Sequence, residues 1–492
     1  MVRRISTKTS IIFIITILAA VLLSACENSL DAYIETDELQ AQEAGILAAP
    51  IININGSVIT GHEEITLTFD ETIDKTTLSL GGTLGDSNPG TEWGQVAFVD
   101  DKVYINSDNY LIWPEGSGKT LTVSCESVSG KVLTGYSFTS DVFYGVCVSP
   151  PDDAVNPGKP SNPGTVTGPL DTIQVGIDKA DTMYVTPANG IDTAEVRVAG
   201  GNYEKVCEIS TPTYIANMIN EISLFGGYSF NFQNRDISNN ITNIVDTSTI
   251  GGVSEAAPVS TVYCDSTIGT STVIDGFSIT LGSDDGIHCA IHCQEGSPTI
   301  SNITISGSGS GDENLVSYGI YLYSSTAKIL NSTIDPGHST AYSAAIVCSQ
   351  NADVTIDGNT IYSGTSDDTY GIKTDTSSDS IITNNTITGG NWSSEGYCIR
   401  VRDCNPTITE NIFNISHGTY WATYAIYERT TNSDPSSLRE NDFNYQGNWY
   451  YDEYLTTVDS TNYNTQQLST LEGSALLLTA IWGNYSTSEN LP

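Results

Sequence analysis

This 492-residue chain has 18 lysines and arginines against 58 acidic residues, and five of the basic residues lie between residues 373 and 439. The segment YCIRVRDC, residues 397–404, carries Arg400 and Arg402 between two cysteines. Lys373 precedes Arg400 by 27 residues, and Arg429 follows Arg402 by the same interval. Guanidinium groups hold carboxylates through parallel hydrogen bonds, so such a group of residues could clamp an acidic ligand.

A second candidate for chemistry is GIHCAIHC, residues 286–293, which on a helix would offer zinc ligands. On a strand, His288 and His292 point one way, and Cys289 and Cys293 the other. The two histidines would then lie about 13 Å apart, at about 3.3 Å per residue. Because zinc–nitrogen bonds are about 2 Å long, we expect buried thiols here and no metal site.

Acidic turns occur at SDDG (283–286) and TSDDTYG (365–371). They could bind calcium weakly, but solvated turns are the favoured explanation. We therefore expect no resident cofactor. The formal net charge of −40 also excludes nucleic acid as a partner, since phosphate backbones are bound by basic surfaces.

A repeat positions these residues. Segments such as TVIDGFSI, VTIDGNTI and PTITENIF recur between about 270 and 445. Their key apolar residues follow one another at intervals of 26 to 30 and are Ile274, Ile300, Ile329, Ile356, Ile382, Ile408 and Leu438. A strand-rich repeat with a period in the twenties predicts a solenoid in which each turn bonds to the next.

Asparagines mark the same place in four consecutive repeats. They stand three residues after the key apolar residue, at Asn359, Asn385, Asn411 and Asn441. Asparagine tolerates left-handed backbone, and its amide can bond to the neighbouring turn. We expect an asparagine ladder at a sharp bend between two strands.

A second strand in each repeat predicts one outward-facing patch, because neighbouring strands lie about 4.8 Å apart. The patch would contain Lys373, Asp375, Arg400, Arg402, Tyr427 and Arg429. Aromatic rings beside guanidinium groups suit a glycan, with stacking on the sugar and a clamp on its carboxylate. The alternative is a solvated face on which Asp375 pairs with the arginines.

The asparagine ladder, together with TIQVGIDKA, AEVRVAGGNYE and SLFGGYSFNFQNRD upstream, resembles the right-handed parallel β-helix of the pectate-lyase-like superfamily. It is most similar to the β-helix lipoproteins of spirochaetes and other bacteria. Enzymes of this superfamily use stacked aspartates to hold calcium, or paired carboxylates for hydrolysis. Here Asp375 stands alone, Asp275 and Asp357 lie three turns apart, and Asp403 and Glu428 form no clear pair. We assign no catalytic residue.

The N-terminus has the pattern of an export signal. A basic start is followed by the apolar run IIFIITILAAVLL and by LSAC at 23–26, which resembles a bacterial lipobox. The resemblance implies lipidation of Cys26 and a membrane anchor in a bacterial cell envelope, at the outer membrane or cell surface. An ordinary signal peptide is the alternative.

Composition shifts divide the rest into domains. We expect a signal peptide over 1–25, an acidic tether over 26–49, a β-sandwich over 50–148, a proline-rich linker over 149–169 and the β-helix over 170–492. The sandwich resembles bacterial Ig-like modules. Leu170, Ile173 and Ile177 predict a short helix that caps the first turn of the β-helix.

Ten cysteines are present. Export would permit disulfides, and Cys125 with Cys147 form the favoured pair because both stand in strands of the predicted sandwich. A Cys264–Cys293 bond is sterically possible if the two occupy equivalent places in neighbouring turns. The other cysteines are expected to be buried thiols.

These observations favour a nearly all-β, lipid-anchored envelope protein. Its β-helix would serve as a non-catalytic binding or adhesion module for a polysaccharide or a surface protein. One alternative is a polysaccharide lyase or hydrolase of the β-helix type, and another is a purely structural component of the envelope.

Overall fold

The computed structural model describes residues 46–463 apart from several short segments. The segments outside the description are 54–57, 85–95, 107–112, 114, 186–190, 208–213, 249–257, 283–285, 308–313, 390, 415–422, 431–432, 434, 440, 444–447 and 453–460. The predicted leader, Cys26 and the rest of the predicted tether up to residue 45 therefore lie outside the described residues. The chain divides into two compact units, Met1–Asn55 with Glu64–Asp141, and Gly56–Glu63 with Val142–Pro492.

The first unit contains two small sheets. One has the order β1-β3-β6-β5, with β1 (Ile51–Ile52), β3 (Ile65–Thr68), β6 (Lys102–Ile105) and β5 (Val96–Val99), and all of its pairs are antiparallel. The other joins β4 (Ser79–Gly81), β7 (Gly116–Glu126) and β8 (Val132–Phe143). Alternate side chains such as Ile65 and Leu67, or Leu121 and Val123, are buried. This alternation is that of a sandwich with one buried face per sheet, while the Ig-like resemblance stays a prediction.

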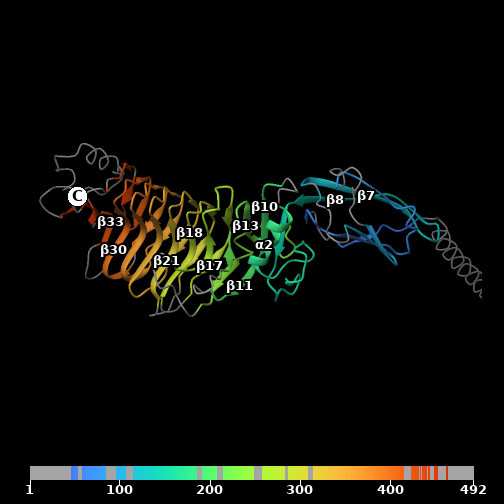
Figure 1. Cartoon of the computed structure of the whole chain (residues 1–492), viewed down its shortest axis with the longest axis horizontal. Coiled ribbons are helices and arrows are strands. Elements are labelled where there is room, and N and C mark those ends of the chain that lie inside the picture. The colour runs from blue at the N-terminus through green and yellow to red at the C-terminus, as the bar shows by residue number, and fades with distance from the viewer. Residues whose placement is uncertain are drawn as a thin grey trace, which may run out of the picture. The chain divides into compact units, whose positions relative to one another are not determined.

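The second unit is a solenoid with three long sheets of parallel strands. Figure 1 shows successive turns stacked from β10 to β33. The first sheet consists of β9 (Gly145–Val148), β10 (Ala194–Ala199), β13 (Ile222–Tyr228), β16 (Val273–Asp275), β19 (Thr299–Ser301), β22 (Lys328–Leu330), β25 (Thr355–Asp357), β28 (Ile381–Thr383), β31 (Thr407–Thr409) and β34 (Ser437–Arg439). The second consists of β11 (Gly201–Lys205), β14 (Thr242–Asp246), β17 (Ser278–Thr280), β20 (Thr304–Ser306), β23 (Thr333–Asp335), β26 (Thr360–Tyr362), β29 (Thr386–Thr388), β32 (Ile412–Asn414) and β35 (Asp442–Phe443).

The third sheet, which carries the candidate site, has the longest strands. It consists of β12 (Ala216–Asn217), β15 (Val259–Cys264), β18 (Gly286–Gln294), β21 (Asn314–Tyr323), β24 (Tyr342–Ser349), β27 (Thr365–Asp375), β30 (Asn391–Arg402), β33 (Thr423–Glu428), β36 (Asn448–Asp452) and β37 (Thr461–Tyr463). Its pairs are parallel up to β36, and β37 is added antiparallel.

The predicted repeat is confirmed residue by residue. The key apolar residues are register partners throughout, from Ile274 with Ile300 to Ile408 with Leu438. The second apolar series, from Ile279 to Phe413, is likewise in register and buried. Each turn therefore buries its apolar side chains directly above those of the previous turn.

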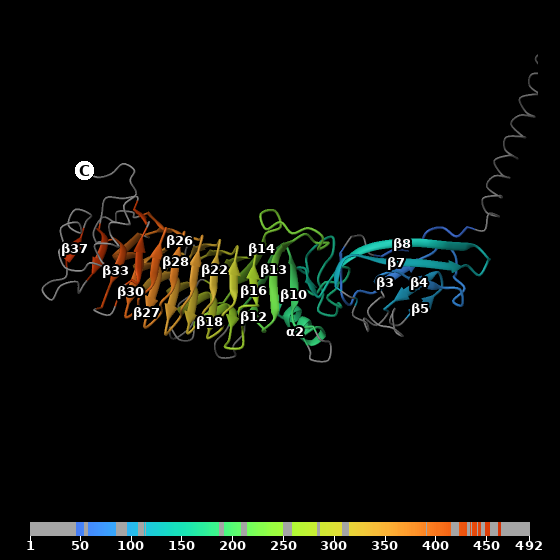
Figure 2. The ribbon, with the colours of Figure 1, turned by 90° about the horizontal axis from the view of Figure 1, so that it is seen from above.

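The single helix among the described residues, α2 (Ile173–Met183), lies beside the first strands of the solenoid, where the sequence predicts a helix (Figure 2). Thr172 caps it by accepting a bond from the Val175 N–H at 3.4 Å. Ile173 and Ile177 are buried, and a Cβ on Gly176 would come within 2.6 Å of Val148. The helix thus shields the apolar interior of the first turn.

The proline-rich segment 149–169 differs from the extended linker that its composition suggests. It folds onto the start of the solenoid, where Cys147 donates its N–H to Gly164 and Leu170 donates to Cys147. The buried Glu63 carboxylate accepts bonds from the N–H groups of Val166 and Thr167. Cys147 itself lies on β9, which pairs with β10, so it belongs to the solenoid and not to the sandwich.

Asn359, Asn385, Asn411 and Asn441 form a continuous buried ladder. Each of the first three donates its amide to the next, at 2.9, 3.0 and 3.1 Å. The left-handed backbone expected of them is instead adopted by the preceding residues Gly358, Asn384 and Glu410. The ladder residues are therefore selected for their amides, which satisfy buried backbone carbonyls and N–H groups of neighbouring turns.

Replacing Asn385 with leucine should lower the free energy of unfolding by about 1–3 kcal/mol, because the backbone N–H of Asn359 loses its buried acceptor. Urea denaturation followed by circular dichroism would measure the change. Asn384→Gly is the matched control, since Asn384 is exposed and glycine accepts its φ of 55°. Equal effects of the two substitutions would contradict the role assigned to the ladder.

Candidate functional site

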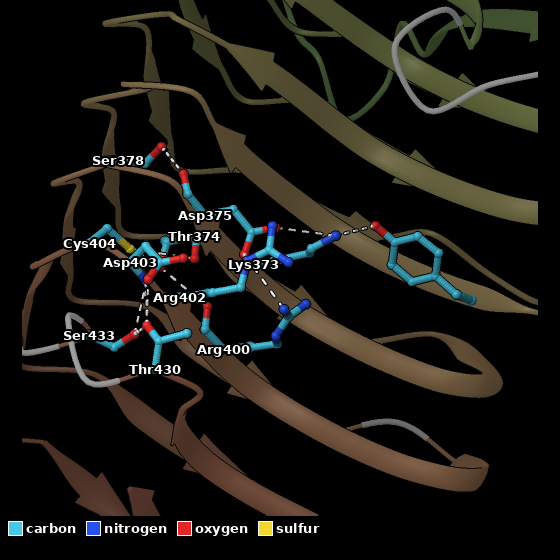
Figure 3. A network of polar contacts seen from close by, with 11 residues as sticks. Lys373, Thr374, Asp375, Ser378, Arg400, Arg402, Asp403, Cys404, Thr430 and Ser433 are labelled. Carbon is cyan, nitrogen blue, oxygen red and sulfur yellow. Dashed lines mark hydrogen bonds and ion pairs between the residues drawn. The ribbon is translucent and has the colours of Figure 1, made fainter. Parts of the chain in front are cut away.

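The charged residues of the predicted patch meet on the outer face of the third sheet. Lys373 and Asp375 end β27, and Arg400 and Arg402 end β30. Lys373 is the register partner of Arg400, and Asp375 is that of Arg402. Figure 3 shows the two arginine side chains turning from their strand toward Asp375 and Lys373. We call these four residues the cation cluster.

Asp375 is the centre of the cation cluster. Its carboxylate lies 3.4 Å from Lys373 Nζ, 3.2 Å from Arg402 Nε and 3.8 Å from Arg400 Nη2. Only 3% of Asp375 is exposed. Lys373 also donates a 3.0 Å hydrogen bond to the Tyr342 hydroxyl. Three cationic side chains thus lie around one buried carboxylate.

Arg400 is the residue with the largest electrostatic cost. It is 3% exposed, and its Nε and Nη2 atoms have no hydrogen-bond partner among the described residues. Removing an ion from water costs several kcal/mol unless hydrogen bonds and opposite charge replace the solvent. The 3.8 Å contact with Asp375 supplies attraction without a hydrogen bond. One edge of the buried guanidinium therefore lacks a hydrogen-bond acceptor among the described residues.

Tyrosine rings support the cations. Lys373 Nζ lies 5.0 Å from the centre of the Tyr342 ring, and Arg400 Cζ lies 5.5 Å from that of Tyr370. These distances permit attraction between a cation and the face of an aromatic ring. The ring centres of Tyr370 and Tyr397 are 5.1 Å apart, and those of Tyr397 and Tyr424 are 5.6 Å apart. The rings form a packed wall beside the cluster.

Sequence reasoning missed this wall, although a signal was present. Tyr370, Tyr397 and Tyr424 stand two residues before Ile372, Ile399 and Ile426, at intervals of 27 residues, and the structure places them in register. A strictly alternating strand would send these tyrosines inward. They instead join the outward Tyr321 and Val347 in one apolar cluster.

The remaining predicted patch residues lie beside the cation cluster. Tyr427 is the register partner of Arg400 and packs edge-on against Tyr397, with ring centres 5.0 Å apart. Arg429 is exposed, and its backbone N–H bonds to Val401. The structure therefore brings Lys373, Asp375 and Arg400 together in a buried group, with Arg402 partly open to solvent at 38% side-chain exposure.

The carboxylates considered for catalysis are engaged elsewhere. Asp275 is paired with Arg235 and accepts bonds from Ser301 and Asn302. Asp403 accepts a 2.8 Å bond from the Thr430 hydroxyl. Glu428 is buried and is the register partner of the fully buried Val401. Asp275 and Asp403 form no ion pair with the cation cluster within the part of the chain described.

The histidine–cysteine segment is packed into the solenoid. Burial lowers the pKa of His292 to about 4, and its ring packs against those of Tyr263 and Tyr321. His288 is buried beside Asp246, with Nδ1 3.6 Å from the carboxylate. Across the described ranges, no group of three or more histidine, cysteine, aspartate or glutamate side chains is placed to hold a metal ion.

All cysteines in the described residues are free and buried, including Cys125 on β7 and Cys147 on β9. The favoured Cys125–Cys147 pair is therefore not formed, since the two belong to different compact units. None of the helices that the structure describes is long and apolar enough to cross a membrane.

A family model described as "Right handed beta helix region" matches residues 285–448. The solenoid is therefore a right-handed parallel β-helix, as the sequence predicts. A search of curated proteins found no match.

Similar solved structures include the A-module of the mannuronan C-5 epimerase AlgE6 of Azotobacter vinelandii. It is 12% identical with a TM-score of 0.28, and the match covers 56% of this chain and 92% of the module. A family 28 exopolygalacturonase of Yersinia enterocolitica is 9% identical with a TM-score of 0.30, over 82% of this chain and 97% of the other. Similarity at this level carries no argument about the activity of this chain.

Removing the carboxylate of the cation cluster and removing one of its cations should change the free energy of unfolding differently. Asp375→Asn removes a buried carboxylate that faces three cations and should lower the free energy of unfolding by about 3–5 kcal/mol. Arg400→Met removes an ion that lacks hydrogen bonds and keeps most of its volume, so the change should be near zero or stabilising.

Urea denaturation of both variants would test this, with Arg429→Met as an exposed control that should change little. A large loss of stability in Arg400→Met would show that Arg400 stabilises the fold, and it would contradict the electrostatic cost assigned to its burial.

Proposed function

We propose that this protein binds an acidic carbohydrate at the cation cluster and displays its β-helix from the bacterial cell envelope for that purpose. The supporting observation is the buried Arg400 guanidinium, whose Nε and Nη2 atoms lack acceptors among the described residues. Nε and Nη2 share one edge of the guanidinium plane. That edge accepts a carboxylate through two parallel hydrogen bonds.

The charge balance supports an anionic ligand. Lys373, Arg400 and Arg402 all face Asp375, and a carboxylate added at Arg400 would give its guanidinium a hydrogen-bonded counter-charge. The ligand would enter past Arg402, the most exposed member. The half-buried Tyr427 beside Arg400 offers an aromatic surface to a sugar ring.

The acidity of the whole chain limits the kind of anion. At a net charge of −40, the protein repels dense polyanions at long range. A glycan that carries spaced carboxylates on uncharged rings is repelled less and still offers a group for Arg400. An acidic surface protein is a second ligand of the same chemistry, and the experiment below separates the two.

Binding can be measured by affinity electrophoresis of a full-length Cys26→Ser chain through gels containing polygalacturonate, mannuronan or neutral dextran. We expect retardation by an acidic polymer and none by dextran. Arg400→Met should weaken retention at least tenfold, as loss of a charge-assisted bidentate contact predicts. Arg429→Met, the control, should retain most of the binding.

The same mixtures decide between binding and catalysis. Appearance of unsaturated or reducing ends that Arg400→Met abolishes would establish the alternative, a polysaccharide-acting enzyme. Absence of retention on every polymer, with unchanged folding, would contradict the carbohydrate proposal and leave a protein ligand or a structural role.

Display from a membrane rests on the lipobox-like LSAC and on Cys26. We expect the chain expressed in a bacterium to incorporate radiolabelled palmitate and to partition into detergent. Cys26→Ser should abolish both, while Cys125→Ser should alter neither. Incorporation of label into the Cys26→Ser chain would contradict the anchor.

A further inference from the structure

Cys264 and Cys293 occupy equivalent places in neighbouring turns of the β-helix. Cys264 ends β15, Cys293 lies one residue before the end of β18, and the two are direct register partners. Both are fully buried. Other strand cysteines face different residues, since Cys289 lies opposite Ser260 and Tyr318, and Cys348 opposite Leu322 and Thr374.

We propose that Cys264 and Cys293 form a disulfide that fastens two successive turns of the β-helix. Partners in neighbouring strands have Cα atoms about 4.8 Å apart, which lies within the range of about 4.4–6.8 Å that disulfides span. The pair stands where both strands give way to turns, and Glu295 follows with a φ of 66°. The strand ends can therefore close toward each other more readily than strand centres.

The reaction is a thiol–disulfide exchange. One thiolate attacks a disulfide oxidant such as oxidised glutathione and forms a mixed disulfide. The second thiolate then displaces the oxidant's thiol, so the two cysteines lose two electrons and two protons while the oxidant becomes two thiols. The neighbouring Cys293 thiol and burial raise the pKa of Cys264 well above its ordinary value, so exchange is slow in the folded chain. The bond should form while these turns are folding.

The crosslink would close a loop of about 30 residues, and in the chain-entropy account a closed loop stabilises by restricting the unfolded chain. It would join turns at the N-terminal part of the β-helix, away from the cation cluster on β27 and β30. The inference therefore stands independently of carbohydrate binding.

The test is to refold the full-length chain in a mixture of oxidised and reduced glutathione, alkylate the remaining thiols and map the peptides by mass spectrometry. We expect a peptide pair joined through Cys264 and Cys293, and two alkylated cysteines fewer than in the reduced chain. The denaturation midpoint in urea should be higher than in the presence of dithiothreitol.

Cys264→Ser and Cys293→Ser should each abolish the joined peptides and the effect of dithiothreitol, whereas Cys289→Ser should keep both. A folded wild-type chain with every cysteine alkylated would overturn the proposal, and so would joining of either cysteine to a different partner. The mapping of the wild-type chain alone decides the matter if a serine variant fails to fold.

Discussion

The in-register stacking of parallel strands is the constraint on which the β-helix depends. Because each turn bonds to the next at about 4.8 Å, a residue type at one position of the repeat is forced beside the residues at the same position in two neighbouring turns. Columns of apolar side chains such as Ile274, Ile300 and Ile329 are therefore buried against one another. Polar residues at interior positions must find partners within their own column, as the asparagine ladder does.

The same constraint builds the cation cluster. The column of Tyr321, Val347, Lys373, Arg400 and Tyr427 runs beside that of Tyr323, Ser349, Asp375 and Arg402. Two cations in adjacent turns of one column repel each other, and Asp375 in the second column offsets part of that repulsion. Tyrosine rings pack beside the group, with Tyr342 near Lys373 and Tyr370 near Arg400.

The parts of this structure that follow from repeat spacing could be predicted from the sequence, because position in a repeat determines register. That includes the apolar columns, the asparagine ladder and the proximity of Lys373, Asp375, Arg400 and Arg402. The burial of Arg400 could not be predicted, since it depends on tyrosines that depart from simple strand alternation. The folded structure of residues 149–169 could not be predicted either, because its hydrogen-bond partners include Glu63, about a hundred residues away in the sequence.

The neighbouring turns provide an internal comparison for the charged residues. Val347 occupies the position before Lys373 and Arg400 in the same column and is 1% exposed. The solenoid therefore accommodates a buried apolar side chain at this position. Replacing buried ions with well-packed apolar residues is often neutral or stabilising, so folding alone does not account for two cations in successive turns. The acidic ligand proposed above would offer a carboxylate to the Arg400 guanidinium, and it would account for a cation at a position where the fold could have used valine.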